Sequence, residues 1–366
     1  MVDISLLTAQ YSQQVDPPRL SIPHGRDLVS PTTQSAIYQT MFDDTRTWPL
    51  PPVPYQTRVL KMILSRIEES ICDPEEDEIL DSLLEKWTSL LSHPKPSAIQ
   101  QAQQLSDIKY TAPTGEEREP RKTVITRESR GLILAAGTTG FRTWEAALHL
   151  GSYLATDAGA SLLRGQRVLE LGAGTGFLSL FCAKYLGAES VFATDREPAL
   201  IEQINDCIGR NGLHGGIQAG IWEWGGPLLI PSSSSSSSGS GSDDEPAPAP
   251  ESEPESGHEN ENENENGNQK SVRFDIALGA DLIYDVDLVP LLVSTIEDLF
   301  NNYSLKQFII SATLRNEETF GTFIETCYQN NLLVDRIPFE STTEETQTGF
   351  FHSTAIPIRT YRVSRA

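Results

Sequence analysis

The stretch Val168-Leu-Glu-Leu-Gly-Ala-Gly-Thr-Gly-Phe177 decides the fold, because an apolar run ends in three closely spaced glycines and an amphipathic segment follows. This order predicts a strand, a tight turn and a helix. Glycine at positions 172, 174 and 176 permits backbone angles that other residues avoid, and it lets a ligand approach without meeting a Cβ. The unpaired N–H groups at the start of the helix suit a nucleotide-like ligand.

The spacing of these glycines argues against a dinucleotide ligand. The dehydrogenase fingerprint requires glycine at its first, third and sixth positions, whereas the sixth position counted from Gly172 is Phe177. A plain strand-to-helix turn without a ligand is the alternative interpretation.

Strand-like and helical patterns alternate from residue 165 onward, which predicts an α/β fold with a parallel sheet between two layers of helices. A polar segment joins the last two strands, so we expect them to form an antiparallel hairpin at the edge of the sheet. The predicted strands are 167–171, 190–194, 216–221, 273–280, 306–312, 333–337 and 355–363, and the predicted helices are 177–186, 197–210, 287–300 and 316–330.

The first third of the chain has a different pattern. Residues 1–55 are rich in Pro, Ser and Thr without a sustained period, which predicts a partly ordered tail. Residues 56–120 are predicted to form a helical module, in which two apolar runs at helical spacing pack as a hairpin. Asp73 with Glu76 predicts the start of the second helix, and Ser97 with Gln100 predicts the start of a third.

Residues 121–366 are predicted to form the main domain. Two β-rich runs between Thr123 and Ala136 suggest a hairpin before its core, and Thr143 is expected to cap a helix that reaches about Asp157. Residues 231–271 interrupt the domain with a run of seven serines, Pro/Glu alternation and four Glu-Asn repeats. Such a composition cannot form a core, so we predict a disordered surface insert.

Composition limits the possible functions. The formal net charge is −23, with ten acidic residues between Asp243 and Glu265, which argues against a nucleic-acid groove and suits either a basic acceptor or simple solubility. Four cysteines show no zinc-ligand spacing, so we expect reduced thiols and no metal. Neither an export signal nor a continuous apolar span is visible, which predicts a cytoplasmic protein.

Several polar and aromatic side chains follow strand ends, where open α/β sheets bind ligands. Asp195 ends the second strand of the main sheet and could accept the ribose hydroxyls of a nucleotide, cap the next helix, or do both. Trp222 and Trp224 follow the third strand and offer a flat surface to a base, although a tryptophan is as often part of the core. Asp281 and Tyr284 follow the fourth strand and are candidates for the acceptor site.

Two of these interpretations have plain structural alternatives. Asp285, and less readily Asp281, could cap the helix that follows. Arg142, Trp144 and Glu145 stand together on the first turn of a predicted helix, where they could close over a ligand or simply begin an amphipathic helix.

Four motifs taken together resemble the methyltransferase-like family of seven-β-strand protein-lysine methyltransferases, and the resemblance covers residues 120–365. It implies the class I methyltransferase fold, Rossmann-like and seven-stranded, with an N-terminal helical module. Within the family, the chain is most similar to the eukaryotic enzymes that methylate a lysine of translation elongation factor 2. The motifs are Arg142-Thr-Trp-Glu145, Glu170-Leu-Gly-Ala-Gly-Thr-Gly176, Trp222-Glu-Trp-Gly225 and Ala280-Asp-Leu-Ile-Tyr-Asp285.

The resemblance also implies S-adenosylmethionine as the cofactor and elongation factor 2 as the protein partner of a monomeric enzyme, with no nucleic-acid or membrane partner and no metal. Asp281 and Tyr284 would match the Asp-x-x-Tyr signature and serve catalysis at the acceptor lysine. A small-molecule methyltransferase with the helical module as a lid, and a non-catalytic scaffold, are the alternatives. The implied cofactor contacts are Trp144, Glu170, Gly172, Ala173, Gly174, Asp195, Trp224 and Ala280.

Overall fold

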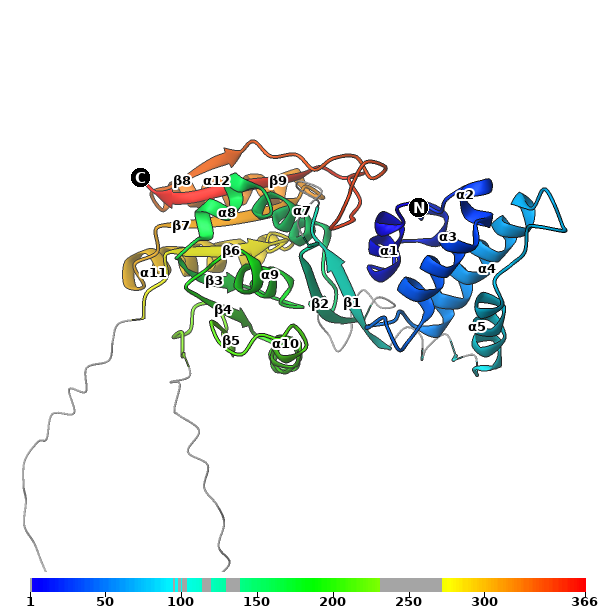
Figure 1. Ribbon diagram of the computed structural model, residues 1–366. Helices are drawn as coiled ribbons and strands as arrows, with labels where there is room; N and C mark the ends of the chain where they lie inside the picture. Colours follow the sequence, from blue (N-terminus) through cyan, green and yellow to red (C-terminus); the bar gives the residue numbers. More distant parts are fainter. Residues whose placement is uncertain are drawn as a thin grey trace, which may run out of the picture. The chain divides into compact units, whose positions relative to one another are not determined.

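The computed structural model describes residues 2–94, 96–97, 100, 104–113, 120–129, 139–230 and 272–366 (Figure 1). The predicted insert at 231–271 and the predicted β-rich run at 132–135 lie outside these residues. In the described part of the chain, no helix is apolar over a length that could cross a membrane.

A sheet of seven strands forms the centre of the described main domain, in the order β5-β4-β3-β6-β7-β9-β8. Strands β3 to β7 pair in parallel, and β9 lies antiparallel between β7 and β8. The predicted fold class and the antiparallel edge hairpin are thus confirmed. The strands are β3 (Arg167–Leu171), β4 (Ser190–Asp195), β5 (Ile217–Ile221), β6 (Ile276–Ala280), β7 (Gln307–Thr313), β8 (Leu332–Ile337) and β9 (Ile358–Arg365).

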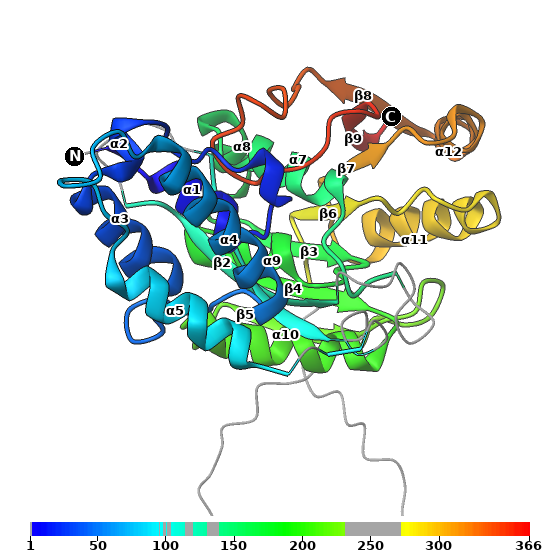
Figure 2. The same cartoon turned by 90° about the vertical axis from the view of Figure 1, so that its right-hand side faces the viewer.

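Helices cover both faces of this sheet. In Figure 2, α11 and α12 lie on the opposite side of the sheet from α7 and α9. Apolar side chains of α7 and α9 form one buried cluster with strands β3 and β6, which is the main core of the domain. The helices are α7 (Glu145–Leu154), α8 (Asp157–Leu163), α9 (Phe177–Tyr185), α10 (Pro198–Arg210), the 3-10 turn η3 (Val286–Leu288), α11 (Val289–Asn302) and α12 (Glu317–Gln329).

Of the hairpin predicted before the core, only the first strand falls within the described residues. Strand β2 (Thr123–Ser129) is where the sequence places it, but it pairs antiparallel with β1 (Leu105–Thr111), a strand that the sequence pattern did not reveal. Polar residues interrupt β1, and only a few of its side chains, Ile108 and Tyr110 among them, are buried. A strand with so few apolar positions gives a weak periodic signal.

The predicted helical hairpin consists of α4 (Val53–Ser70) and α5 (Asp81–Ser92), whose apolar faces share a buried cluster. The prediction that Asp73 caps the second helix is wrong. Asp73 instead belongs to a turn, where its Oδ1 accepts a hydrogen bond of 3.1 Å from the backbone nitrogen of Glu75. The predicted capping pair between Ser97 and Gln100 is present, with reciprocal bonds of 2.9 and 3.2 Å.

Residues 2–52 contain short helices where the sequence predicts a partly ordered tail. Their apolar side chains, including Tyr11, Leu28 and Phe42, are buried against α4. Gln13 fastens this segment to the loop before β9, because its amide donates to the carbonyl oxygen of Phe351 and accepts a 3.0 Å bond from the nitrogen of Phe351. The elements are α1 (Ser5–Ser12), η1 (Pro17–Arg19), α2 (Arg26–Val29), α3 (Pro31–Ile37) and η2 (Tyr38–Phe42).

Candidate active site

A cavity of about 390 Å³ lies where β3, β4 and β6 end, which is the edge of the sheet that the sequence motifs indicate. This volume is within the range of sites that bind small molecules. The structure brings all the predicted site residues together on the cavity wall, while their roles in binding and catalysis stay predictions. These residues are Trp144, Glu170, Gly172, Ala173, Gly174, Asp195, Trp224, Ala280, Asp281 and Tyr284.

The glycine turn after β3 has the backbone geometry that the sequence predicts. Gly172, Gly174 and Gly176 have φ angles of +60°, +53° and +75°, a region that side chains with a Cβ rarely adopt. A Cβ at position 174 would also lie 3.0 Å from the carbonyl oxygen of Gly140. Both the backbone angle and the close approach of another segment therefore require glycine at position 174.

Asp195 connects this turn with the turn after β4. Its Oδ2 accepts a 2.9 Å hydrogen bond from the nitrogen of Gly174, and its Oδ1 accepts a 3.1 Å bond from the nitrogen of Glu197. Burial raises the pKa of Asp195, and these backbone bonds oppose the rise. The residue does not cap α10 as the alternative interpretation supposed, because the N-cap position of α10 is Glu197.

Glu170 lies buried beneath the glycine turn, on the last part of β3. It accepts a 2.9 Å hydrogen bond from the nitrogen of Ser179 and a second bond from the hydroxyl group of Ser179. Burial raises the pKa of Glu170 to about 7, although the two bonds from Ser179 lower it. This carboxyl group thus ties the first turn of α9 to β3 from inside the core.

The two tryptophans after β5 differ in their surroundings, although both border the cavity. Trp222 is buried, and its Nε1 donates a 3.0 Å hydrogen bond to the carbonyl oxygen of Gly226, which is the environment of a core residue. Trp224 is only half-buried, and its ring comes within 3.9 Å of the Cβ position of Gly172. Trp224 is therefore the better candidate to contact a base above the glycine turn.

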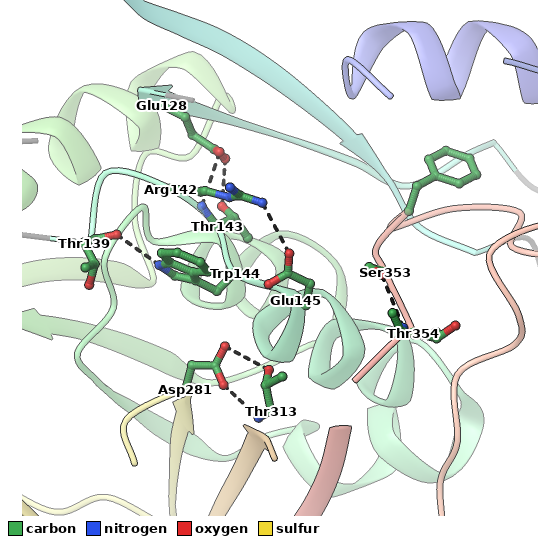
Figure 3. Close-up of polar contacts among 12 residues, drawn as sticks. Glu128, Thr139, Arg142, Thr143, Trp144, Glu145, Asp281, Thr313, Ser353 and Thr354 are labelled. Atoms are coloured by element: carbon green, nitrogen blue, oxygen red, sulfur yellow. Dashed lines mark hydrogen bonds and ion pairs between the residues drawn. The ribbon is translucent and has the colours of Figure 1, made fainter. Parts of the chain in front are cut away.

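Asp281 directly follows β6 and has a positive φ of 52°, which is uncommon for a residue other than glycine. Its carboxylate accepts bonds of 2.8 Å and 3.1 Å from the backbone nitrogen and the hydroxyl group of Thr313, as Figure 3 shows. Burial raises the pKa of Asp281, and the bonds from Thr313 and the charge of Arg315 oppose the rise. Two neighbouring strand ends, those of β6 and β7, thus fix this carboxylate.

Tyr284 and Asp285 lie farther out on the same loop. Tyr284 is 63% exposed and borders the cavity, so it can meet a ligand that approaches from solvent. Asp285 accepts a 3.0 Å bond from the nitrogen of Asp287 at the start of η3, which confirms the predicted capping role.

Trp144 forms another part of the cavity wall, just before α7. Its Nε1 donates a 3.0 Å bond to the carbonyl oxygen of Thr139, and the guanidinium carbon of Arg142 stands 4.9 Å from the ring centroid (Figure 3). Arg142 also lies 3.3 Å from a carboxylate oxygen of Glu145. The hydrogen bond from Nε1 holds the edge of the indole ring, and Arg142 packs on its face, so the orientation of the ring is fixed.

The prediction that Thr143 caps α7 is wrong, because its hydroxyl group is engaged elsewhere. It donates a 2.7 Å bond to the carboxylate of Glu128 on β2, and that carboxylate also accepts a bond from the backbone nitrogen of Thr143 (Figure 3). Glu128 is buried and further accepts bonds from Tyr110 and Thr126. The β1–β2 hairpin thus holds the segment before α7 against the cavity.

Sequence reasoning missed several cavity residues, notably Thr143, Thr175 and Arg315. Arg315 could have been found by the rule that selected Asp281, because it follows the end of β7 at the same edge of the sheet. The hydroxyl groups of Thr143 and Thr175 lie 2.7 Å apart, a contact between distant segments that no local pattern reveals. Among the described residues, no group of three or more His, Cys, Asp or Glu side chains could hold a metal ion.

Comparison with known proteins adds an independent finding. Residues 134–236 match a family described as lysine methyltransferase. The chain is 36% identical to the protein-lysine N-methyltransferase EFM3 of Chaetomium thermophilum, over 94% of each protein. It is 27% identical to EFM3 of Saccharomyces cerevisiae over 80% of this chain and 77% of that protein. It is 30% identical to the human protein-lysine N-methyltransferase EEF2KMT over 24% of this chain and 26% of that protein.

Proposed function

Because the chain belongs to the lysine methyltransferase family, we propose that it transfers a methyl group from S-adenosylmethionine to a lysine of translation elongation factor 2. Membership of this family means that the chain is a protein-lysine N-methyltransferase. The cofactor site, the acceptor protein and the residue roles are our proposal. The observation that carries it is that one cavity contains both the glycine turn and Asp281.

The residues of the glycine turn and of β4 fit a nucleoside. A carboxylate has about four lone-pair positions, and backbone bonds from Gly174 and Glu197 use one on each oxygen of Asp195. The remaining positions can accept the two ribose hydroxyl groups. Trp224 offers its half-buried ring to the adenine base, and the turn at Gly172 lets the backbone approach the rest of the cofactor.

Asp281 is the residue proposed to receive the acceptor amine. Its carboxylate would accept a hydrogen bond from the lysine ammonium group and orient the nitrogen, while Thr313 keeps the carboxylate in place. Tyr284 at the rim would present its aromatic face to the cation.

The lysine nitrogen must lose a proton to solvent before it reacts, which costs roughly 4.6 kcal/mol at pH 7 from an ordinary pKa of about 10.4. Removing water from the amine lowers this cost. S-adenosylmethionine would supply an electrophilic methyl group on a sulfonium centre. The lone pair of the lysine nitrogen would form the new N–C bond, and the electrons of the broken C–S bond would stay on sulfur. Alignment of the reacting atoms by the cavity wall accounts for most of the rate.

Elongation factor 2 is proposed as the substrate on the basis of the four sequence motifs, which resemble those of the enzymes that modify it. The match with the Chaetomium thermophilum relative extends over nearly the whole chain, including the N-terminal helices, and it supports the more general part of the proposal, a protein acceptor modified at lysine. A monomeric enzyme that acts in the cytoplasm is part of the same proposal.

The test is incubation of the purified protein with labelled S-adenosylmethionine and with elongation factor 2 made in bacteria. We expect label on elongation factor 2, located at one lysine by mass spectrometry. Asp281→Ala should lower turnover by about two to three orders of magnitude with little change in cofactor affinity. Asp335→Ala, an exposed position on β8, is the matched control and should keep full turnover.

Each alternative predicts a different result. In a cell extract, label on another protein would overturn the substrate assignment, and label in a soluble compound would favour a small-molecule methyltransferase. Calorimetry without any binding of S-adenosylmethionine would favour a scaffold.

A further inference from the structure

Arg315 lies at the Asp281 end of the cavity and contacts three groups that attract a cation. Its Nη1 lies 3.4 Å from Oδ2 of Asp281, and its Nη2 lies 3.4 Å from Oε2 of Glu145. Its guanidinium carbon stands 5.3 Å from the ring centroid of Trp144. Two carboxylates and an indole face are also the surroundings that a lysine ammonium group would favour. Arg315 therefore occupies a position suited to the acceptor itself.

Among these groups, the carboxylate of Asp281 is held firmly, whereas the guanidinium group of Arg315 is not. Asp281 has a side chain that is 10% exposed, and Thr313 fixes its carboxylate with bonds of 2.8 and 3.1 Å. The Arg315 side chain is 43% exposed, and it meets each carboxylate through one long contact instead of a bidentate pair. Exposed contacts of this kind are weak, so the guanidinium group can leave while Asp281 stays in place.

We propose that Arg315 is a cationic placeholder, a specificity-determining residue that fills the acceptor subsite until a substrate lysine displaces its guanidinium group from Asp281. The inference deepens the proposed function and rests on it, because it takes Asp281 to be the acceptor carboxylate. After displacement, Glu145 at the start of α7 still offers Arg315 a partner.

The placeholder makes the subsite selective for positive charge. If a neutral group displaced Arg315, the largely buried carboxylate of Asp281 would lose its counter-ion, which is unfavourable. A lysine ammonium group instead replaces the charge that Arg315 withdraws. The same competition lowers the affinity of the subsite for cations, because every cation that enters must displace Arg315.

Binding of n-butylammonium, which has the charged end of a lysine side chain, tests this competition directly. The titration uses the full-length protein in low salt and is followed by calorimetry. Arg315→Met removes the competing charge and preserves much of the side-chain length, so we expect about three- to thirtyfold tighter binding than in the wild type. Arg315→Lys keeps a cation and should bind like the wild type. Uncharged n-butanol should gain no affinity in either variant.

Arg142→Met is the matched control. Arg142 contacts the same indole ring and the same Glu145, but no contact with Asp281 is found among the described residues. This variant should therefore show no gain in n-butylammonium affinity. A gain of equal size in Arg142→Met would overturn the placeholder role, and so would unchanged or weaker binding by Arg315→Met, which is the result expected of a purely structural brace.

The two proposals can fail separately. If elongation factor 2 is methylated but Arg315→Met does not tighten n-butylammonium binding, only the placeholder role is overturned. If elongation factor 2 stays unmodified while Arg315→Met tightens binding, the substrate assignment fails and the placeholder role is supported.

Discussion

The carboxylate of Asp195, at the end of β4, accepts a 2.9 Å hydrogen bond from the backbone nitrogen of Gly174, in the turn after β3. The same carboxylate accepts a bond from the nitrogen of Glu197, so it links the two turns that begin α9 and α10. Both turns border the cavity. One side chain therefore shapes the proposed cofactor site and is also one of the proposed cofactor contacts.

Replacing Asp195 with Ala should weaken S-adenosylmethionine binding by about one to two orders of magnitude, because hydrogen bonds to a charged group are worth about 1.5–3 kcal/mol. The freed N–H group of Gly174 would loosen the turn as well. Calorimetric titration of the cofactor measures the loss, with Asp335→Ala as the control at an exposed site. Unchanged affinity would remove Asp195 from the cofactor site.

A pair of glycine substitutions separates backbone strain from crowding. Gly174 and Gly212 both have positive φ angles, +53° and +69°, but a Cβ would lie 3.0 Å from the carbonyl oxygen of Gly140 only at position 174. Gly212→Ala should lower the free energy of unfolding by about 1–2 kcal/mol and leave cofactor affinity unchanged. Gly174→Ala should lower both, as measured by urea unfolding and calorimetry. Equal effects of the two substitutions on affinity would contradict this expectation.

The two tryptophans after β5 should respond in opposite ways to truncation. Trp222→Ala should lower the free energy of unfolding by about 3–5 kcal/mol, because it empties a buried site. Trp224→Ala should leave stability nearly unchanged and lower cofactor affinity by about one to two orders of magnitude, as expected for a lost base-stacking contact. Thermal unfolding and cofactor titration of both variants test the assignment, which fails if Trp222→Ala alone lowers affinity.

The parallel sheet and its binding edge could be predicted because both depend on local sequence. Buried parallel strands are short apolar runs, so β3, β4, β6 and β7 stand out, and ligands bind at their carboxyl ends. This reasoning selects Asp195 and Asp281 without knowledge of any contact. Arg315 also follows the end of a parallel strand, so the same rule could have selected it from the sequence.

Local signals failed where a distant residue replaces the local partner. Thr143 looks like a helix cap, but the buried carboxylate of Glu128 binds its hydroxyl group and its backbone nitrogen. Asp73 looks like the cap of α5, but the helix starts later, and Oε1 of Gln34 accepts a 2.9 Å bond from the nitrogen of Leu80 at its start. Short helices such as α2 (Arg26–Val29) are stabilised by burial against α4 and show no period of their own.

Protonation of Glu170 makes the stability of the folded protein depend on pH. Its ordinary pKa is 4.5, and burial raises this value to about 7 in the folded protein. Between these two pH values, the folded state holds a proton that the unfolded chain has lost. The extra stability that this proton gives the folded state is thus fully present below pH 4.5 and is lost as the pH rises through 7.

Glu170→Gln should remove this pH dependence, because glutamine has a similar shape and cannot ionise. Between pH 5 and pH 8, the free energy of unfolding of the wild type should fall by about 3 kcal/mol relative to the variant. Urea unfolding at several pH values measures the difference. Glu344→Gln is the control: hydrogen bonding by Ser353 lowers the pKa of Glu344, so its contribution is lost only at lower pH and stays constant in this window. If the difference in the free energy of unfolding between the wild type and Glu170→Gln is also the same at every pH, the pKa of Glu170 is not raised by folding.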